Sequence, residues 1–165
     1  MPVRAFVAAT LALVVVTVPG VPASAAGTWT WPVTGPVIRA FDPPDSPYGS
    51  GHRGIDIAVP AGTVVLAPAD GRVTFAGPVG GRLFLTIDHS GGLESTYSWV
   101  AALDVRRGDL VGRGQPVARS GTGHTGDAVP NLHVGVKLDD AYVDPLDYLE
   151  PVDIAGWLRL APVPG

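Results

Sequence analysis

The sequence predicts an all-β fold built from short antiparallel strands. Its 165 residues include 22 glycines and 17 prolines, and these separate short runs rich in β-branched residues, as in sheet proteins with many tight turns. No helical periodicity of useful length occurs before Leu146. Without the presequence described below, the chain has the length of one ordinary domain with its own core. We therefore expect a compact antiparallel β-sheet sandwich.

Eight segments have the β-branched and aromatic content, and the bounding turn residues, that are typical of strands. In chain order they are Val37–Phe41, Gly54–Ala58, Thr63–Leu66, Gly71–Ala76, Leu83–Asp88, Glu94–Ser98, Gln115–Ser120 and Leu132–Lys137. Turns are expected at Ala69–Gly71 and Ser90–Gly92, where glycine supplies the backbone freedom that a tight turn requires. A short helix over Asp153–Leu160 is expected to pack on the sheet, because its apolar residues have helix-compatible spacing.

The N-terminal sequence predicts export. Arg4 precedes an apolar run from Ala5 to Val18, and the small residues of Ala23–Ala25 follow a Pro-Gly pair, as at a signal peptidase site. The run is shorter than the roughly 20 residues of a membrane span, so an uncleaved anchor is the weaker alternative. We expect a signal peptide at residues 1–25 and a secreted or cell-wall-associated protein without a membrane span after cleavage. The remaining divisions are a Pro/Gly-rich arm (26–50), a core (51–149) and a tail (150–165).

Composition excludes several classes of site. Cysteine is absent, so the exported chain has neither disulfides nor thiolate zinc ligands. The formal net charge is −4 at pH 7, which argues against a nucleic-acid partner, because such binders carry clustered positive charge.

Three residues have the chemistry of a metal site. His52 and Asp56 occur in GHRGID, and His133 occurs in NLHVGV. Two imidazoles and one carboxylate can hold a catalytic zinc ion while leaving its fourth position open. In extended chain, side chains alternate in direction, so His52 and Asp56 share one face while Ile55 and Ile57 take the other. In the second segment, Asn131 shares a face with His133, and Leu132 lies on the opposite, core-facing side. The sequence therefore predicts one Zn²⁺ held by His52, Asp56 and His133; a hydrogen-bonded cluster without metal is the alternative.

These segments resemble the lysostaphin-type, LytM-like zinc metalloendopeptidases, which cut the peptide cross-links of bacterial cell walls. The likeness runs from Trp31 to Leu149 and includes GTVVLAPADGRVTFAG, LFLTIDHSGGLESTY and YVDPLDYL in the family's order. The resemblance implies that family's sandwich, of the duplicated hybrid motif type, with one zinc ion and a peptidoglycan peptide as partner.

The chain departs from the family at two positions. Active members that resemble it carry one more histidine in a Tyr-x-His-Leu phrase and another as the first residue of His-x-His. Here Trp99 and Asn131 occupy those positions, and neither side chain exchanges a proton near neutral pH. General acid–base catalysis contributes about 10²–10⁴-fold, so we expect weak hydrolysis or none. The asparagine amide could still donate a hydrogen bond to a substrate carbonyl.

Two functions of different class follow from these residues. The first is a degenerate peptidase that binds peptidoglycan peptide, or a cell-wall hydrolase, without cutting efficiently. The alternative is an active endopeptidase in which His124, from the Gly-rich segment GTGHTGDAVP, substitutes as the base. A lipoyl- or biotin-carrier function, suggested by APADGRVTFAG, is excluded because that hairpin has no lysine to modify.

Two further residues are assigned by position alone. His89 is expected at a turn or sheet edge rather than at a metal. Trp99 is either core filler or an aromatic platform in the groove that a glycan or peptide would occupy.

Overall fold

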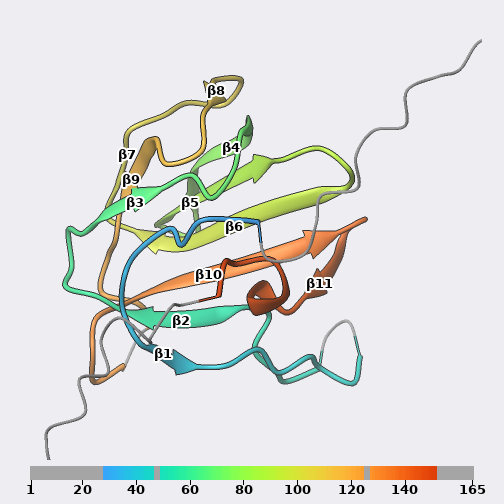
Figure 1. The fold of residues 1–165 in the computed structure, drawn as a ribbon. Coiled ribbons are helices and arrows are strands. Elements are labelled where there is room, and N and C mark those ends of the chain that lie inside the picture. The colour runs from blue at the N-terminus through green and yellow to red at the C-terminus, as the bar shows by residue number, and fades with distance from the viewer. Residues whose placement is uncertain (1–27, 47–48, 125–126, 152–165) are drawn as a thin grey trace, which may run out of the picture.

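The fold is all-β and antiparallel, which confirms the predicted class (Figure 1). The computed structural model describes residues 28–46, 49–124 and 127–151. Within these ranges the large sheet has the strand order β1 (Val37–Arg39), β2 (Ile55–Ala58), β10 (Asn131–Leu138), β6 (Leu93–Val100), β5 (Arg82–Asp88), β4 (Gly71–Val79) and β8 (Leu110–Val111), with β11 (Ala141–Val143) paired to β10. The small sheet consists of β3 (Val64–Leu66), β9 (Pro116–Arg119) and β7 (Ala102–Leu103).

The eight predicted strands all occur, with ends that differ by a few residues. The sequence missed β7, β8 and β11, and also the short 3₁₀ helix η1 (Pro145–Asp147). Each missed strand has only two or three residues and exists because a longer strand pairs with it, so its local pattern is weak. The turn after β5 has positive φ at Ser90, Gly91 and Gly92, as expected of the Gly-rich segment.

The core confirms the predicted apolar faces. Ile55 and Ile57 of β2 are completely buried, and so is Leu132 of β10. The opposite faces of these strands are buried as well: Asp56 is 2% exposed and His133 is 8% exposed. Both strands lie in the middle of the large sheet, and both of their faces are covered. Buried polar groups of this kind need partners.

The segment before β1 is integrated into the core. Trp29 is 2% exposed and pairs with Leu149 in an isolated parallel bridge. Its backbone N–H donates to Tyr148, and the indole N–H of Trp31 donates to the Glu150 carbonyl. The beginning and end of the described chain therefore hold each other in place.

The chain passes from the large sheet to the small one at the end of β6. Trp99 has φ of 56°, a left-handed conformation that is uncommon outside glycine. After it, Ala101 donates its N–H to Arg119 of β9. Gly121, which follows β9, packs so closely on the Trp99 carbonyl that a Cβ there would collide with it. This bend fixes the position of the Trp99 ring beside the functional site.

Two expectations lie outside the described residues, namely the signal peptide at 1–25 and the helix at Asp153–Leu160. Among the residues that are described, no helix has the length and apolarity needed to cross a membrane.

Candidate metal centre

His52 precedes β2 and is held by its backbone and by one ring nitrogen. Its backbone N–H donates to the Asp42 carbonyl and its carbonyl accepts the Asp42 N–H, so the two residues form an isolated antiparallel bridge. Its Nδ1 lies 2.7 Å from the carbonyl oxygen of Ala40. Because a carbonyl can only accept, Nδ1 carries a hydrogen, and in the neutral ring Nε2 presents its lone pair. This arrangement is typical of a metal-binding histidine oriented by a backbone carbonyl.

Asp56 and His133 are brought together by strand pairing. They are direct register partners across β2 and β10, and His133 Nδ1 lies 2.8 Å from Asp56 Oδ1. His52 Nε2 is 3.1 Å from the same carboxylate oxygen and 3.1 Å from His133 Nδ1. The three predicted ligands thus converge on one point through the atoms that would bind a metal.

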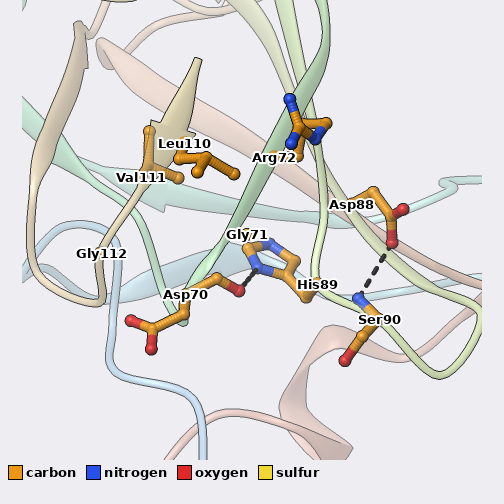
Figure 2. A pocket seen from close by; sticks show the side chains of 9 residues that line it. All are labelled: Asp70, Gly71, Arg72, Asp88, His89, Ser90, Leu110, Val111 and Gly112. Atoms are coloured by element: carbon orange, nitrogen blue, oxygen red, sulfur yellow. Dashed lines mark hydrogen bonds between the residues drawn. The ribbon is translucent and has the colours of Figure 1, made fainter. Parts of the chain in front are cut away.

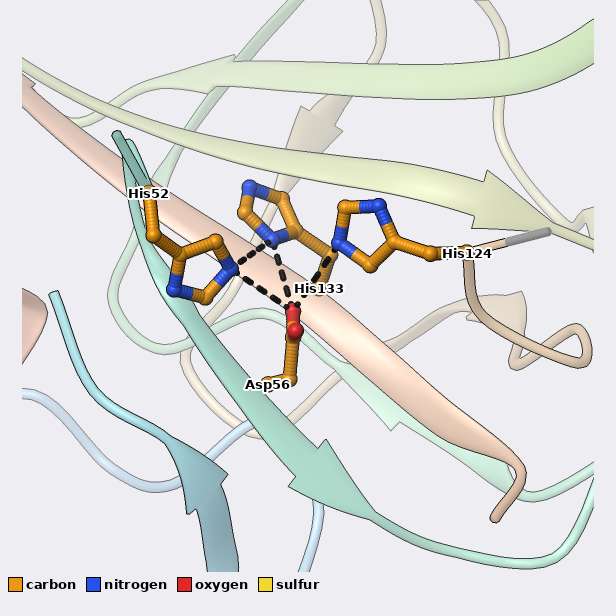
Figure 3. A group of neighbouring side chains, drawn as sticks. All are labelled: His52, Asp56, His124 and His133. Carbon is orange, nitrogen blue, oxygen red and sulfur yellow. Dashed lines mark hydrogen bonds and ion pairs between the residues drawn. The ribbon is translucent and has the colours of Figure 1, made fainter. Parts of the chain in front are cut away.

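His124 joins this group from the loop between β9 and β10 (Figure 3). Its Nε2 lies 3.4 Å from Asp56 Oδ1. One donor atom from each of His52, Asp56, His124 and His133 lies within 4.8 Å of all the others. Figure 3 shows the three imidazoles arranged around the carboxylate.

The donor set fits zinc. Neighbouring ligands of a tetrahedral zinc ion, each about 2.0–2.1 Å from the metal, lie about 3.3 Å apart. Of the six separations between the four donor atoms, four range from 2.8 to 3.4 Å, and all six are within 4.8 Å. Moreover, with a neutral His52 ring the lone pair on Nε2 faces a carboxylate oxygen, a contact between two acceptors that a cation would stabilise.

The electrostatics favour the ligand forms of the buried pair. Burial alone would raise the pKa of Asp56, but its hydrogen bond with His133 and the nearby imidazoles together lower that pKa below its ordinary value. Burial lowers the pKa of His133 and outweighs the opposing effect of Asp56. Near neutral pH the carboxylate is therefore ionised and the imidazole of His133 is neutral, as metal binding requires.

Trp99 and Asn131 both contact the His124 loop. The ring centroid of Trp99 lies 3.9 Å from that of His124 and 5.6 Å from that of His133. Trp99 is half-buried and also borders a surface pocket with Arg82 and Leu83. It is therefore part of the site's wall rather than core filler.

Asn131 is occupied by hydrogen bonds to the same loop. Its side-chain nitrogen donates to Asp127 Oδ2 at 2.8 Å and to the Val129 carbonyl at 3.0 Å. Asp127 Oδ2 also accepts the backbone N–H of His124 at 2.8 Å. Asp127 was not predicted from the sequence, although an aspartate three residues after His124 in a Gly-rich loop is a recognisable turn-forming signal.

His89 lies apart from this cluster and makes structural contacts (Figure 2). Its Nδ1 bonds to the Asp70 carbonyl at 3.0 Å, and its Nε2 lies 2.7 Å from Ser95 Oγ. Its ring packs on Trp29 with centroids 4.5 Å apart. Burial lowers its pKa below the ordinary value. As expected, it follows a strand at a turn, and its ring joins the turn to the core.

Known proteins share this fold and these segments. The family model described as Peptidase family M23 matches residues 50–145. An uncharacterised protein of Mycobacterium tuberculosis is 36% identical over 140 residues, which cover 81% of this chain and 54% of that protein. The murein hydrolase activator NlpD of Escherichia coli is 36% identical over 124 residues, covering 74% of this chain and 31% of that protein.

A solved structure also has this fold. The crystal structure of a zinc-containing peptidase from Vibrio cholerae matches 76% of this chain and 41% of that chain, with a TM-score of 0.63 and 28% identity. The chain thus spans about half, or less, of the length of these relatives.

The matched segment covers more than half of the chain and contains all four clustered side chains. The predicted relationship to the lysostaphin-type peptidases is confirmed. The chain belongs to Peptidase family M23.

Proposed function

We propose that this chain is a secreted zinc-binding domain that acts at the bacterial cell wall by binding peptidoglycan peptide or a cell-wall hydrolase, with weak or no cleavage of its own. The proposal depends on the identity and the contacts of Trp99 and Asn131. They occupy the positions where active relatives are expected to have histidines, and both contact the loop that carries His124.

The chemistry of these two side chains explains the expected loss of activity. A zinc ion at this site would lower the pKa of a water molecule and polarise a carbonyl group. Hydrolysis also needs a nearby group that accepts a proton and returns it to the leaving amine. The Trp99 indole is a donor only, and the Asn131 amide does not titrate. The Asn131 side-chain nitrogen is, in addition, already bonded to Asp127 and Val129.

The relatives support the location and the metal. NlpD is named as a murein hydrolase activator, and this name supports a cell-wall hydrolase as a partner. The Vibrio cholerae relative is titled a zinc-containing peptidase. The predicted signal peptide at residues 1–25 supports delivery of the chain to the same compartment.

Active hydrolysis with His124 as the base is the second candidate. The observation in its favour is the position of His124 Nε2, 3.4 Å from Asp56 Oδ1 and directly beside the three predicted ligands. A general base must lie within reach of the metal site, and His124 meets that condition.

Incubation of the purified protein with purified peptidoglycan, in the presence of zinc, distinguishes the binding function from active hydrolysis. Sedimentation measures binding, and release of soluble fragments measures cleavage. We expect the protein to co-sediment without releasing fragments, and to alter fragment release when a cell-wall hydrolase is added. His133→Ala provides the metal-free control. Zinc-dependent release by the wild-type protein alone would favour the active enzyme, and absence of both binding and any effect on a hydrolase would contradict a cell-wall role.

A further inference from the structure

His124 is fixed in place by contacts from three directions. Its backbone N–H donates to Asp127 Oδ2 at 2.8 Å, and its carbonyl accepts the Asp127 N–H at 3.2 Å. The Trp99 ring packs against its imidazole at 3.9 Å between centroids. Its neighbour Gly123 has φ of 84° and lies directly against the Asn131 side chain, where any Cβ would collide. The loop conformation therefore depends on both Trp99 and Asn131.

The ring nitrogen Nε2 of His124 forms no hydrogen bond with the described residues. Nε2 is buried and has no hydrogen-bond partner there, although the side chain as a whole is 24% exposed. A buried polar atom without a partner is destabilising. This atom is directed at the carboxylate of Asp56, 3.4 Å away, without the alignment of a hydrogen bond. A metal ion shared with Asp56 would satisfy both groups.

The number of protein ligands determines what a zinc site can do. Catalytic sites generally have three protein ligands and one position open to water or substrate, whereas sites with four protein ligands are closed and structural. Here four donor atoms, rather than three, lie within 4.8 Å of one another. The imidazole of His124 packs on the Trp99 ring. Figure 3 shows it facing Asp56 from the side opposite His52, and a fourth donor there would leave no position open for water.

We propose that His124 is a fourth protein ligand, so that the zinc site is closed, with His52, Asp56 and His133 as the other ligands. Trp99 and Asn131 then have a positive role: they are positioning residues, the first packing on the His124 ring and the second holding its loop through Asp127. This inference rests on the proposed function and deepens it, because a closed site would hold zinc without the open position that cleavage needs.

Substitution with cobalt tests the coordination directly. Four-coordinate Co²⁺ absorbs visible light strongly, and five- or six-coordinate Co²⁺ absorbs weakly, so the spectrum reports the geometry. We expect the wild-type protein to give the strong spectrum and to be insensitive to azide, a small anion that binds open positions. His124→Phe keeps a ring against Trp99 but removes the nitrogen, and its spectrum should change in intensity and titrate with azide.

Zinc affinity, measured by competition with a chelator, gives a second readout. Loss of an outer partner of a metal ligand costs about 10–100-fold in affinity, so loss of a ligand should cost at least that much. Thr122→Ala is the matched control, because Thr122 is exposed in the same loop and should behave as wild type. His124→Ala, with its folding checked by circular dichroism, is a second variant without the ring nitrogen, for use if His124→Phe does not fold.

An azide response in the wild type equal to that of the folded His124 variants, or unchanged zinc affinity in those variants, would overturn the inference. The proposed function is tested separately, by the peptidoglycan assay. A closed cobalt spectrum in a protein that neither binds cell wall nor affects a hydrolase would support the fourth ligand and contradict the cell-wall role.

Discussion

Asp56 and His133 lie 77 residues apart in the sequence but are direct partners across β2 and β10, with Oδ1 and Nδ1 2.8 Å apart. Their separation is set by the backbone pairing of two buried strands rather than by flexible side chains. The core that buries Ile55 and Leu132 therefore also holds two ligands at the spacing that zinc requires.

His133→Ala is expected to abolish stoichiometric zinc binding. It removes a buried donor that is close to both Asp56 and His52, and loss of a ligand should lower the metal affinity enough that zinc does not survive dialysis. Metal content after zinc supplementation and dialysis measures the effect. His89→Gln is the control, since His89 bonds to Asp70 and Ser95. Full zinc occupancy in folded His133→Ala would contradict the assignment of His133 as a ligand.

Restoring the two missing histidines is not expected to restore cleavage by itself. In the double variant Trp99→His/Asn131→His, the His124 loop loses two contacts, but the His124 imidazole can still reach the metal and compete with water, so we expect little activity on peptidoglycan. Adding His124→Ala should produce measurable, zinc-dependent release of soluble fragments, because the groups act as a unit. Histidine tolerates the left-handed backbone at position 99 better than most residues.

The loss of the Trp99 ring leaves a cavity that costs a few kcal/mol, so thermal unfolding of each of these variants must be measured first. Cleavage by the double variant as fast as by the triple variant would contradict a blocking role for His124.

Gly123→Ala is expected to weaken zinc binding. A Cβ at this position collides with the Asn131 side chain, which holds the loop of His124 through Asp127. Because support of this kind contributes about 10–100-fold to metal affinity, we expect a loss of at least tenfold. Gly114→Ala is the matched control: its φ of 77° is close to the 84° of Gly123, but no atom lies within 4 Å of its Cβ position. Equal affinity in the two variants would mean that the Asn131 contact is unimportant.

The metal-free protein should lose stability as the pH falls below about 6.5, partly because of His89. Burial lowers the pKa of folded His89 below its ordinary value of 6.5. Between the folded and unfolded pKa values only the unfolded chain binds the proton, so the contribution is fully present above 6.5 and is lost as the pH falls through the folded pKa. Denaturant unfolding at several pH values measures the slope. His89→Gln should reduce that slope, and an unchanged slope would contradict this account.

The sequence by itself determined the strands, their buried faces and the three predicted ligands. Alternation in GHRGID and NLHVGV is a local property, so Ile55, Ile57 and Leu132 could be assigned to the core from their positions alone. The departure from active relatives at Trp99 and Asn131 was equally visible, because it depends only on residue identity.

Tertiary structure decided what those residues do. The polar faces of β2 and β10 are buried because neighbouring strands and loops cover them, which no local pattern shows. The short strands β7, β8 and β11 exist only through pairing with distant partners. His124 lies beside Asp56 because Asn131, Asp127 and Trp99 together fix the conformation of a Gly-rich loop. That placement results from contacts between separate segments. The sequence of the loop alone did not decide whether His124 lies at the metal site or faces solvent.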